Sequence, residues 1–488
     1  MVVEGWLERA AATRPAHTAL ATAHGSCTYA QLLAGADACA ARLLELGVER
    51  GQRVAIALPA GLAFAQTLHA CLLLGVIAVP VDLRLAAEER ERIVAGAAVL
   101  VEQPLCEPSQ FAGARGGVGA HRKDHEVGER EDEHRASEGG GNARKFDGAA
   151  RARVRARSTN KIGEHQLEST AVIVHTSGTT SVPKPVELTY GNFLWSALGS
   201  AVALGLDPRE RWLCTLPLAH VGGLSILLRS AIYATTAVVH ERFETDLALH
   251  ALRNQQITLV SVVATTLARL LDAGLDQPAS LRCALAGGGP VPTALLERAA
   301  RAGVPVSQTY GLTETCSQVT ATPVASLGVG ELSSDAGPPL FCTRVELAAD
   351  GEIMVASPTV AAATCDNDGW LRTGDLGELD ERGRLRVTGR KADTIVSGGE
   401  NVAPTEVEAV LESHPDVLEA AVVGRVDQQW GEAVTAIVVA RPGASLVEAE
   451  LRTHCSARLA SFKIPKRFAL TGGPLPRTPS GKLLRREL

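Results

Sequence analysis

Residues 175–192 read His-Thr-Ser-Gly-Thr-Thr-Ser-Val-Pro-Lys-Pro-Val-Glu-Leu-Thr-Tyr-Gly-Asn and directly follow the apolar run 171–174. The run predicts a buried strand, and the segment behind it offers backbone amides, hydroxyl donors and one cation to a polyphosphate. We interpret the segment as a phosphate-binding loop, with an ordinary surface loop as the alternative. Lys184 stands six residues after Gly178 and precedes Pro185. This spacing differs from that of P-loop kinases and GTPases, so the sequence disfavours those classes.

Length and composition bound the class of protein. A chain of 488 residues exceeds what one hydrophobic core usually serves, so we expect two or more domains. A hydrophobic content of 46% suits a soluble globular protein, and a net charge of -6 disfavours wholesale nucleic-acid binding. The cysteines include no C-x-x-C pair, which argues against a zinc ribbon or a disulfide framework and favours a reducing compartment.

The sequence carries no recognisable secretory leader or membrane span. The first residues include Glu4 and Glu8 and lack a basic start followed by an apolar core. The longest uncharged apolar stretch, 70–81, is interrupted by Gly75 and Pro80 and is too short to cross a bilayer. We therefore expect a cytoplasmic protein without membrane insertion, and the sequence leaves open whether it forms a homo-oligomer.

Three patterns of predicted secondary structure follow one another along the chain. Up to about residue 336, predicted helices alternate with short apolar strands, a pattern typical of parallel βα units. From about Gly337, short strands separated by glycine turns predict a β-rich, antiparallel subdomain. The last part predicts a compact α+β unit. We expect an α/β protein with a large N-terminal domain of several subdomains, 1–390, and a small C-terminal domain, 391–488.

The stretch 113–161 departs from this organisation. It holds only four large apolar side chains among many Gly, Arg, Glu and His residues, too few to offset the entropy lost on ordering. We predict that it is disordered or aberrant, through an insertion or a slipped reading frame. The arginine-rich run 151–157 lacks interleaved aromatic residues, so it is better interpreted as a solvated segment than as a nucleic-acid site.

Five motifs occur in order: the phosphate loop, Tyr310-Gly-Leu-Thr-Glu-Thr315, Thr373-Gly-Asp375, Gly389-Arg390 and Pro479-Ser-Gly-Lys482. Their order and separations resemble those of the acyl-adenylate-forming enzymes, which include acyl-CoA synthetases, luciferases and peptide-synthetase adenylation domains. The resemblance implies a two-step reaction of ATP, CoA and a small carboxylic acid. The carboxylate attacks the α-phosphorus of MgATP and releases pyrophosphate; the CoA thiol then attacks the acyl-adenylate and releases AMP. Catalysis would rest on positioning and charge neutralisation.

The resemblance also implies which residues bind ATP. Those that would hold the β- and γ-phosphates are Thr176, Ser177, Gly178, Thr179, Thr180 and Lys184. Adenine would pack on Tyr310 close to Gly287, Gly288 and Gly289. The ribose hydroxyls would bind Asp375 and Arg390. Ser181 and Pro185 stand where the family commonly has glycine, which predicts a stiffer loop.

Three further residues would act on the reacting groups, again by resemblance. Thr313 would contact the α-phosphate, and Glu314 would bind Mg²⁺, since a carboxylate suits a cation that substrate phosphates also hold. Lys482 would bridge the substrate carboxylate and the α-phosphate during adenylation, where a flexible point charge neutralises the developing charge.

The C-terminal domain is expected to be mobile. Lys482 lies in it together with Gly398 and Gly399, which we expect to contact CoA. The family rotates this domain between half-reactions, and the pivot would fall near 391–393. Ala392 occupies the position where the family commonly has Asp or Lys, so a pivot there is a hypothesis.

Three stretches, 194–200, 216–229 and 261–265 with the glycines 287–289, resemble the subfamily that activates o-succinylbenzoate, an aromatic dicarboxylate of menaquinone synthesis. The candidate pocket residues are His220, Gly223, Arg229, Ser261 and Thr265. The second carboxylate of such a substrate needs donors or a cation, which Thr265 and Arg229 could supply, Arg229 through water. A surface position for Arg229 is the alternative.

Two other functions stay open. Another aryl or fatty acyl-CoA synthetase would carry the same motifs, and a non-catalytic nucleotide-binding homologue would explain Ser181, Pro185 and the unusual stretch 113–161. An amino-acid-activating domain is disfavoured, because no acidic residue stands out to pair with a substrate ammonium group.

Overall fold

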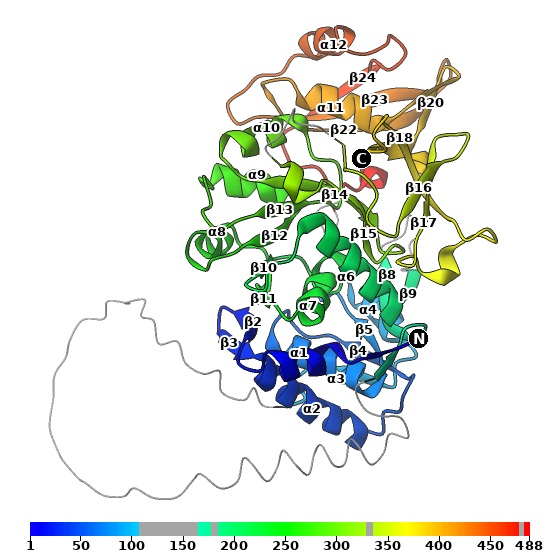
Figure 1. Cartoon of the computed structure of the whole chain (residues 1–488). Coiled ribbons are helices and arrows are strands. Elements are labelled where there is room, and N and C mark those ends of the chain that lie inside the picture. Colours follow the sequence, from blue (N-terminus) through cyan, green and yellow to red (C-terminus); the bar gives the residue numbers. More distant parts are fainter. Residues whose placement is uncertain (107–163, 177–183, 328–334, 478–482) are drawn as a thin grey trace, which may run out of the picture.

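The computed structural model describes residues 1–106, 164–176, 184–327, 335–477 and 483–488 (Figure 1). Within these ranges five sheets form: two large sheets with mostly parallel strands, a two-stranded sheet, an antiparallel sheet and the sheet of the C-terminal unit. The predicted α/β class, with a β-rich subdomain and a small α+β unit behind it, is confirmed. The prediction for 113–161 concerns residues outside the described ranges.

The largest sheet has eight strands in the order β15-β14-β13-β12-β10-β11-β2-β3. Its inner strands run parallel and are β2 (Thr18–Thr22), β10 (Arg211–Cys214), β11 (Thr236–Val239), β12 (Leu259–Val262), β13 (Cys283–Ala286) and β14 (Val306–Leu312). Antiparallel strands form both edges, β15 (Ser317–Ala321) and β3 (Gly25–Thr28). β11, β12 and β13 are buried along their whole length, as expected for strands covered on both faces.

A second sheet of five strands has the order β6-β4-β5-β8-β9. Four strands run parallel, β4 (Arg53–Ile56), β5 (Ile77–Pro80), β6 (Val99–Val101) and β8 (Thr170–Thr176), and β9 (Lys184–Thr189) runs antiparallel at the edge. The two-stranded sheet pairs β1 (Val2–Glu4) with β7 (Glu164–Gln166). The helices beside these sheets are α1 (Trp6–Thr13), α2 (Tyr29–Glu45), α3 (Leu62–Leu74) and α4 (Ala87–Val94).

Alternating side chains divide the hydrophobic core between the two faces of the large sheet. In β12, Leu259 joins the core that continues to the five-stranded sheet, whereas Val260 joins the core on the opposite face. The helices that follow β9 in this part of the chain are α6 (Tyr190–Leu204), α7 (Val221–Tyr233), α8 (Thr245–Asn254), α9 (Ala264–Asp272) and α10 (Thr293–Arg301). Residues of α6 and α7 belong to the first core, and residues of α8, α9 and α10 belong to the second. Because both faces of the sheet are packed, the carboxyl ends of its strands are held at fixed positions relative to one another.

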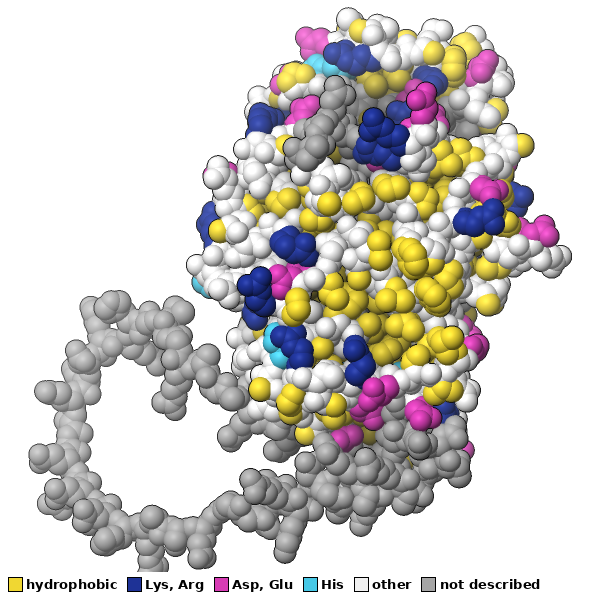
Figure 2. Space-filling model, viewed as in Figure 1, with side chains coloured by type: hydrophobic (Ala, Val, Ile, Leu, Met, Phe, Trp, Pro, Cys, Tyr) yellow, Lys and Arg dark blue, Asp and Glu magenta, His cyan; other side chains and the backbone are white. Residues whose placement is uncertain are grey.

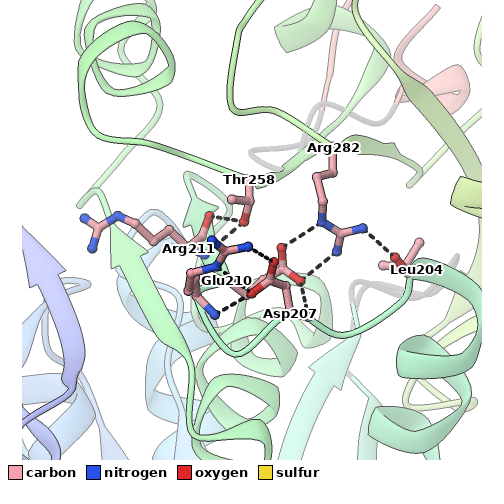
Figure 3. Close-up of polar contacts among 7 residues, drawn as sticks. Leu204, Asp207, Glu210, Arg211, Thr258 and Arg282 are labelled. Carbon is pink, nitrogen blue, oxygen red and sulfur yellow. Dashed lines mark hydrogen bonds and ion pairs between the residues drawn. The ribbon is translucent and has the colours of Figure 1, made fainter.

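A buried ion pair fastens the end of α6 to the large sheet (Figure 3). Arg282, just before β13, donates from Nε and Nη2 to the Glu210 carboxylate at 3.2 and 2.7 Å, and from Nη1 to the Leu204 carbonyl at 3.0 Å. Glu210 is only 2% exposed. The starts of β10 and β13, which β12 separates in the sheet, and the end of α6 are therefore joined through a carboxylate that has left water.

Replacing Arg282 with alanine is expected to lower the free energy of unfolding by about 3–5 kcal/mol, because Glu210 would remain buried without its cation. Urea denaturation of the purified variant measures the change. Arg209→Ala is the matched control, since Arg209 forms an exposed ion pair with Asp207 two residues away and is expected to leave stability nearly unchanged. Equal losses in both variants would contradict the assignment.

The β-rich subdomain is an antiparallel sheet whose strands pair in chain order, β16 (Arg344–Leu347), β17 (Glu352–Ala356), β18 (Leu371–Leu379) and β19 (Leu385–Arg390). Short 3-10 helices accompany it, η1 (Val324–Ser326), η2 (Ala362–Thr364) and η3 (Lys391–Asp393). The sheet has its own small core around Ile353 and Val355. It ends at η3, where the predicted C-terminal domain begins.

The C-terminal unit, drawn in orange to red at one end of the molecule in Figure 1, has a separate hydrophobic core. Its elements are β20 (Ile395–Ser397), β21 (Glu400–Val402), α11 (Pro404–Glu412), β22 (Val417–Asp427), β23 (Gly431–Ala440), α12 (Glu448–Ser456), β24 (Arg467–Thr471) and η4 (Arg485–Glu487). The strands pair in the order β21-β20-β23-β22, and β24 joins β23 in parallel. The boundary at 390/391 and the mobility of the unit stay predictions.

Apolar side chains gather over the middle of the face drawn in Figure 2. Three large apolar residues on or just after α6 are exposed, Leu198, Val202 and Leu206. Leu198 and Val202 are four residues apart and so lie on one side of α6, whereas Leu206 follows Gly205, which ends the helix. Exposed apolar residues that lie close together are found at contacts between chains. Among the helices of the described ranges, none combines the length and apolar character that a bilayer span requires.

Candidate active site

The carboxyl ends of three neighbouring parallel strands define the candidate site. β12, β13 and β14 lie side by side and run parallel. Ser261, the glycines 287–289 and Tyr310 therefore lie toward the same, carboxyl end of these strands. Open α/β sheets bind ligands at this edge. Tyr310 lies within β14, which extends past it because Tyr310 and Leu312 pair with β15.

Asp375 joins two of the predicted nucleotide residues. The Tyr310 hydroxyl donates to Oδ2 of Asp375 at 2.8 Å, and Nε of Arg390 approaches Oδ1 at 3.0 Å. Asp375 and Arg390 face each other across β18 and β19. Burial first, and the Asp375 charge second, raise the pKa of Tyr310, so its hydroxyl stays protonated as a donor. The structure thus brings Tyr310, Asp375 and Arg390 together, as a shared nucleotide site requires.

Glycines permit the close approaches on this edge. A Cβ on Gly287 would lie 2.7 Å from Cγ2 of Thr309, and Gly288 has φ +80°, which other residues rarely adopt. Gly311, which the sequence analysis did not single out, is more constrained. A Cβ there would lie 1.6 Å from the Ser317 carbonyl oxygen, at the bulge between β14 and β15. A Cβ on Gly289 would meet open space.

The turn after β14 carries the predicted catalytic pair Thr313 and Glu314. The Thr313 carbonyl accepts the Cys316 amide at 3.0 Å, and the Glu314 carbonyl accepts the Ala361 amide at 2.8 Å. Both side chains are half-buried. Within the described ranges no group of three or more His, Cys, Asp and Glu could hold a metal ion. That Glu314 holds magnesium stays a prediction.

The predicted phosphate loop leaves β8 and returns into β9. Thr176 and Lys184 pair at its base, and the Thr176 hydroxyl donates to the Lys184 carbonyl at 3.4 Å. Ser177, Gly178, Thr179, Thr180 and Ser181 lie outside the described residues. Pro185 belongs to β9, an edge strand, where a missing amide donor is tolerated. Pro185 therefore stands in the strand behind the loop, and the predicted stiffness of the loop itself concerns residues outside the described ranges.

Lys482 also lies outside the described residues, but the chain on both sides of it is anchored. Nη2 of Arg477 binds Glu419 at 2.6 Å, and Nη2 of Arg485 binds Glu408 at 2.6 Å. Both carboxylates belong to the C-terminal unit, on β22 and α11. The two ends of the segment that carries Lys482 therefore stay with this unit.

Arg229 is buried in α7 and is only 3% exposed, so the alternative of a surface position is wrong. Nη2 of Arg229 donates to the Ser196 hydroxyl at 2.9 Å, and its guanidinium lies 5.8 Å from the ring centroid of Trp212. The indole of Trp212 in turn donates to Ser261 at 3.1 Å. Burial lowers the pKa of Arg229, yet a guanidinium remains charged at neutral pH. No carboxylate of the described residues forms an ion pair with it.

The other pocket candidates lie in different environments. His220 precedes α7, and its Nε2 lies 3.3 Å from Oδ2 of Asp82 and 3.3 Å from Nη2 of Arg84. Gly223 must be small, because a Cβ would lie 2.5 Å from the Pro217 carbonyl oxygen. Thr265 is exposed in the first turn of α9, just past the carboxyl end of β12. Arg229 and Thr265 therefore do not share one environment.

Asp82 and Arg84 contact His220 but were not predicted from the sequence as site residues. They follow the buried strand β5, and Arg84 binds Asp82 through Nε at 2.8 Å and through Nη2 at 2.6 Å. Burial raises the pKa of Asp82, but hydrogen bonds from Arg84 and His220 outweigh it and lower the pKa overall. The signal that could have found them is their place directly after an apolar strand.

Gly398 and Gly399, predicted to contact CoA, form the two-residue turn between β20 and β21. Both have positive φ angles, 62° and 86°, as a tight hairpin of this kind requires. The Gly398 amide donates to the Trp430 carbonyl at 2.8 Å. The turn is thereby held against the start of β23.

The α/β fold, the candidate nucleotide site at the carboxyl ends of parallel strands and the separate C-terminal unit together define a nucleotide-binding α/β enzyme. Comparison with known protein families agrees with this class. The chain belongs to the AMP-binding enzyme family: the family profile matches residues 7–363, and that of the AMP-binding enzyme C-terminal domain matches 406–482. Among its relatives, a 2-succinylbenzoate–CoA ligase of Bacillus licheniformis is 39% identical over 99% of this chain and 98% of its own.

Solved structures agree with this likeness. The o-succinylbenzoate CoA synthetase of Bacillus subtilis in complex with its acyl-adenylate intermediate OSB-AMP has a TM-score of 0.82 and 35% identity, and covers 100% of this chain and 98% of that one. The same enzyme in complex with ATP and a magnesium ion has a TM-score of 0.81 and 35% identity, with both chains covered completely.

Proposed function

We propose that this protein is an AMP-forming acid–CoA ligase that activates o-succinylbenzoate and transfers the acyl group to CoA, as a cytoplasmic enzyme of menaquinone biosynthesis. The geometry that supports it best is the Asp375 carboxylate, held between Tyr310 of β14 and Arg390 of β19. The full-length likeness to 2-succinylbenzoate–CoA ligases supports the choice of acid.

The site residues divide the work of the first step. Asp375 and Arg390 would orient the ribose, and the glycines 287–289 would let adenine lie close to the backbone beside Tyr310. Lys184 and the loop residues 176–180 would hold the β- and γ-phosphates. Magnesium supplies positive charge to the phosphates when bound, and Glu314 is the residue that would hold it. The substrate carboxylate then displaces pyrophosphate from the α-phosphorus, with Thr313 and Lys482 at the reacting groups.

In the second step the CoA sulfur forms a bond to the acyl carbon, and AMP leaves with the electrons of the acyl–oxygen bond. The domain of 391–488 would rotate about Ala392 and bring Gly398 and Gly399 to the CoA. Rotation would remove Lys482 from the site without moving Asp375, which belongs to β18.

Arg229 supports the aromatic dicarboxylate as substrate. A buried guanidinium whose contacts are a hydroxyl and an indole ring has charge left for an anion, and the second carboxylate of o-succinylbenzoate supplies one. Ser261 would contribute through Trp212, to which it is hydrogen-bonded. His220, Gly223 and Thr265 would line the rest of the pocket.

The test is direct. Purified protein is incubated with MgATP, CoA and o-succinylbenzoate, and AMP and the CoA thioester are measured by mass spectrometry. We expect both products in equal amounts, and no thioester when ATP is omitted. Benzoate and medium-chain fatty acids tested in parallel identify another acyl-CoA synthetase if they react faster. Tight ATP binding without AMP formation for any acid would indicate a non-catalytic homologue.

The exposed apolar side of α6 supports a homo-oligomer as part of the proposal. Sedimentation equilibrium measures the mass of the particle in solution, and a mass of one chain at all concentrations would exclude it.

A further inference from the structure

Glu352, the first residue of β17, has a buried carboxylate that the proposed mechanism does not use. Its side chain is 7% exposed and binds three donors. Oε1 accepts the Gly374 amide at 3.0 Å, and Oε2 accepts Nζ of Lys391 at 3.2 Å and Nη1 of Arg372 at 3.4 Å. Burial raises the pKa of Glu352, but the Gly374 amide and Lys391 outweigh it and lower the pKa overall. The carboxylate therefore carries its charge at neutral pH.

The Gly374 amide belongs to an irregular part of the sheet. On one side β17 and β18 pair at Glu352 and Leu376, and on the other at Met354 and Arg372. Three residues of β18, 373–375, thus face the single residue Ile353, which makes a bulge. Gly374 takes a φ of +71° there. Glu352 supplies the acceptor for an amide that a regular ladder would otherwise pair.

This bulge sets the direction of Asp375. The Thr373 hydroxyl donates to the Ile353 carbonyl at 2.8 Å and accepts the Asp375 amide at 3.1 Å. Bulges re-aim side chains, because the extra residues turn the strand locally. The Asp375 carboxylate, which binds Tyr310 and Arg390, therefore depends for its position on the backbone that Glu352 holds.

The contacts of Glu352 also close a ring. Gly374 precedes Asp375, and Lys391 follows Arg390 in the chain. One link between these two pairs of residues is the direct contact of Asp375 with Arg390 at 3.0 Å, and the other runs through Glu352 from Gly374 to Lys391. Lys391 opens η3, directly before Ala392, where the C-terminal domain would pivot.

We propose that Glu352 is a positioning residue of the nucleotide site. It stabilises the bulge that sets the direction of Asp375. Through Lys391 it also connects this bulge to the residue directly before the proposed pivot at Ala392. The inference deepens the proposed function and rests on it, because it gives Asp375 and Arg390 their roles toward ATP. Glu352 itself touches no substrate.

Lys391 provides a matched control, since it has a second carboxylate partner. Its Nζ lies 2.6 Å from Oδ2 of Asp350, an exposed residue. Glu352→Gln removes the charge that attracts Lys391 and leaves the Gly374 amide only the weaker, neutral oxygen of an amide, with almost no change in shape. Asp350→Asn removes an ion pair of the same lysine and leaves the Gly374 amide with its acceptor.

Isothermal titration with AMP, and with MgATP, measures the effect without any turnover. We expect Glu352→Gln to weaken nucleotide binding about tenfold, the loss typical of one charge-assisted hydrogen bond, and Asp350→Asn to change it less than about twofold. In an Asp375→Asn background, Glu352→Gln should weaken nucleotide binding little further, because its effect acts through Asp375. Thermal melting is recorded in parallel.

Unchanged nucleotide affinity of Glu352→Gln with a lowered melting temperature would overturn the proposal and leave a purely structural ion pair. Equal losses in Glu352→Gln and Asp350→Asn, or full additivity with Asp375→Asn, would also overturn it. If Glu352→Gln does not fold, Lys391→Met cuts the ring at its other end. It is expected to slow thioester formation several-fold relative to adenylate formation, and an unchanged ratio would refute the link to the pivot. A wild-type protein that binds AMP without ligase activity would refute the proposed function while the titrations still judge Glu352.

Discussion

Lys482→Ala is expected to slow formation of the acyl-adenylate by about 10²–10³-fold, the loss typical when one preorganised charge is removed from a reacting centre. The lysine would neutralise charge as the carboxylate approaches the α-phosphorus, so its removal raises the barrier of that step alone. Rapid-quench measurement of pyrophosphate release, with o-succinylbenzoate and MgATP, reports the rate.

The second half-reaction provides the comparison. Supplied with presynthesised acyl-adenylate and CoA, Lys482→Ala should form thioester at close to the wild-type rate, because the charge needed for adenylation is no longer required. Lys463→Ala is the control, since Lys463 lies in the same domain but binds Glu406 at the surface. Equal slowing of both half-reactions would contradict an adenylation role and point to general damage.

Arg229→Met should lower kcat/KM for o-succinylbenzoate by roughly 10–200-fold, as expected for the loss of one charge-assisted contact of about 1.5–3 kcal/mol. The analogue that lacks the ring carboxylate, 4-oxo-4-phenylbutanoate, should react equally well with wild type and variant. Steady-state kinetics with both acids measure this selectivity. A similar loss for both acids would mean that Arg229 does not meet the second carboxylate.

The same variant should keep its stability, which separates binding from folding. Arg229 has no carboxylate partner among the described residues, so its removal strands no buried anion, and an apolar side chain of similar length fits a buried position. Ser196 retains its hydrogen bond to the Cys316 carbonyl at 2.7 Å. A large fall in the melting temperature of Arg229→Met would indicate a structural role instead.

Local signals in the sequence predicted much of the fold. Capping residues are one such signal: α2 starts at Tyr29, and the Thr28 hydroxyl before it accepts the Gln31 amide at 3.3 Å. Short apolar runs predicted the inner strands of the large sheet, because such strands are buried on both faces. That Asp375 and Arg390 serve one site was expected only from resemblance, since the two residues lie on different strands, and their direct contact was not predicted.

What the sequence could not supply depends on contacts between distant segments. Nothing near Arg229 distinguishes a buried position from a surface one, because its burial comes from α6 and from Trp212 of β10. Pro185 was assigned to a loop, since the pairing of β8 with β9 is not visible in either segment alone. Glu352 escaped notice because its partners, Gly374 and Lys391, come more than 20 residues later.

Gly311 gives the fold a practical marker. Since a methyl group at this position would overlap the Ser317 carbonyl, any natural homologue with another residue there must have rebuilt the turn between the two edge strands. In collections of related genomes, a glycine at this one position therefore indicates proteins that keep the same turn between β14 and β15, and any other residue indicates proteins in which this turn differs.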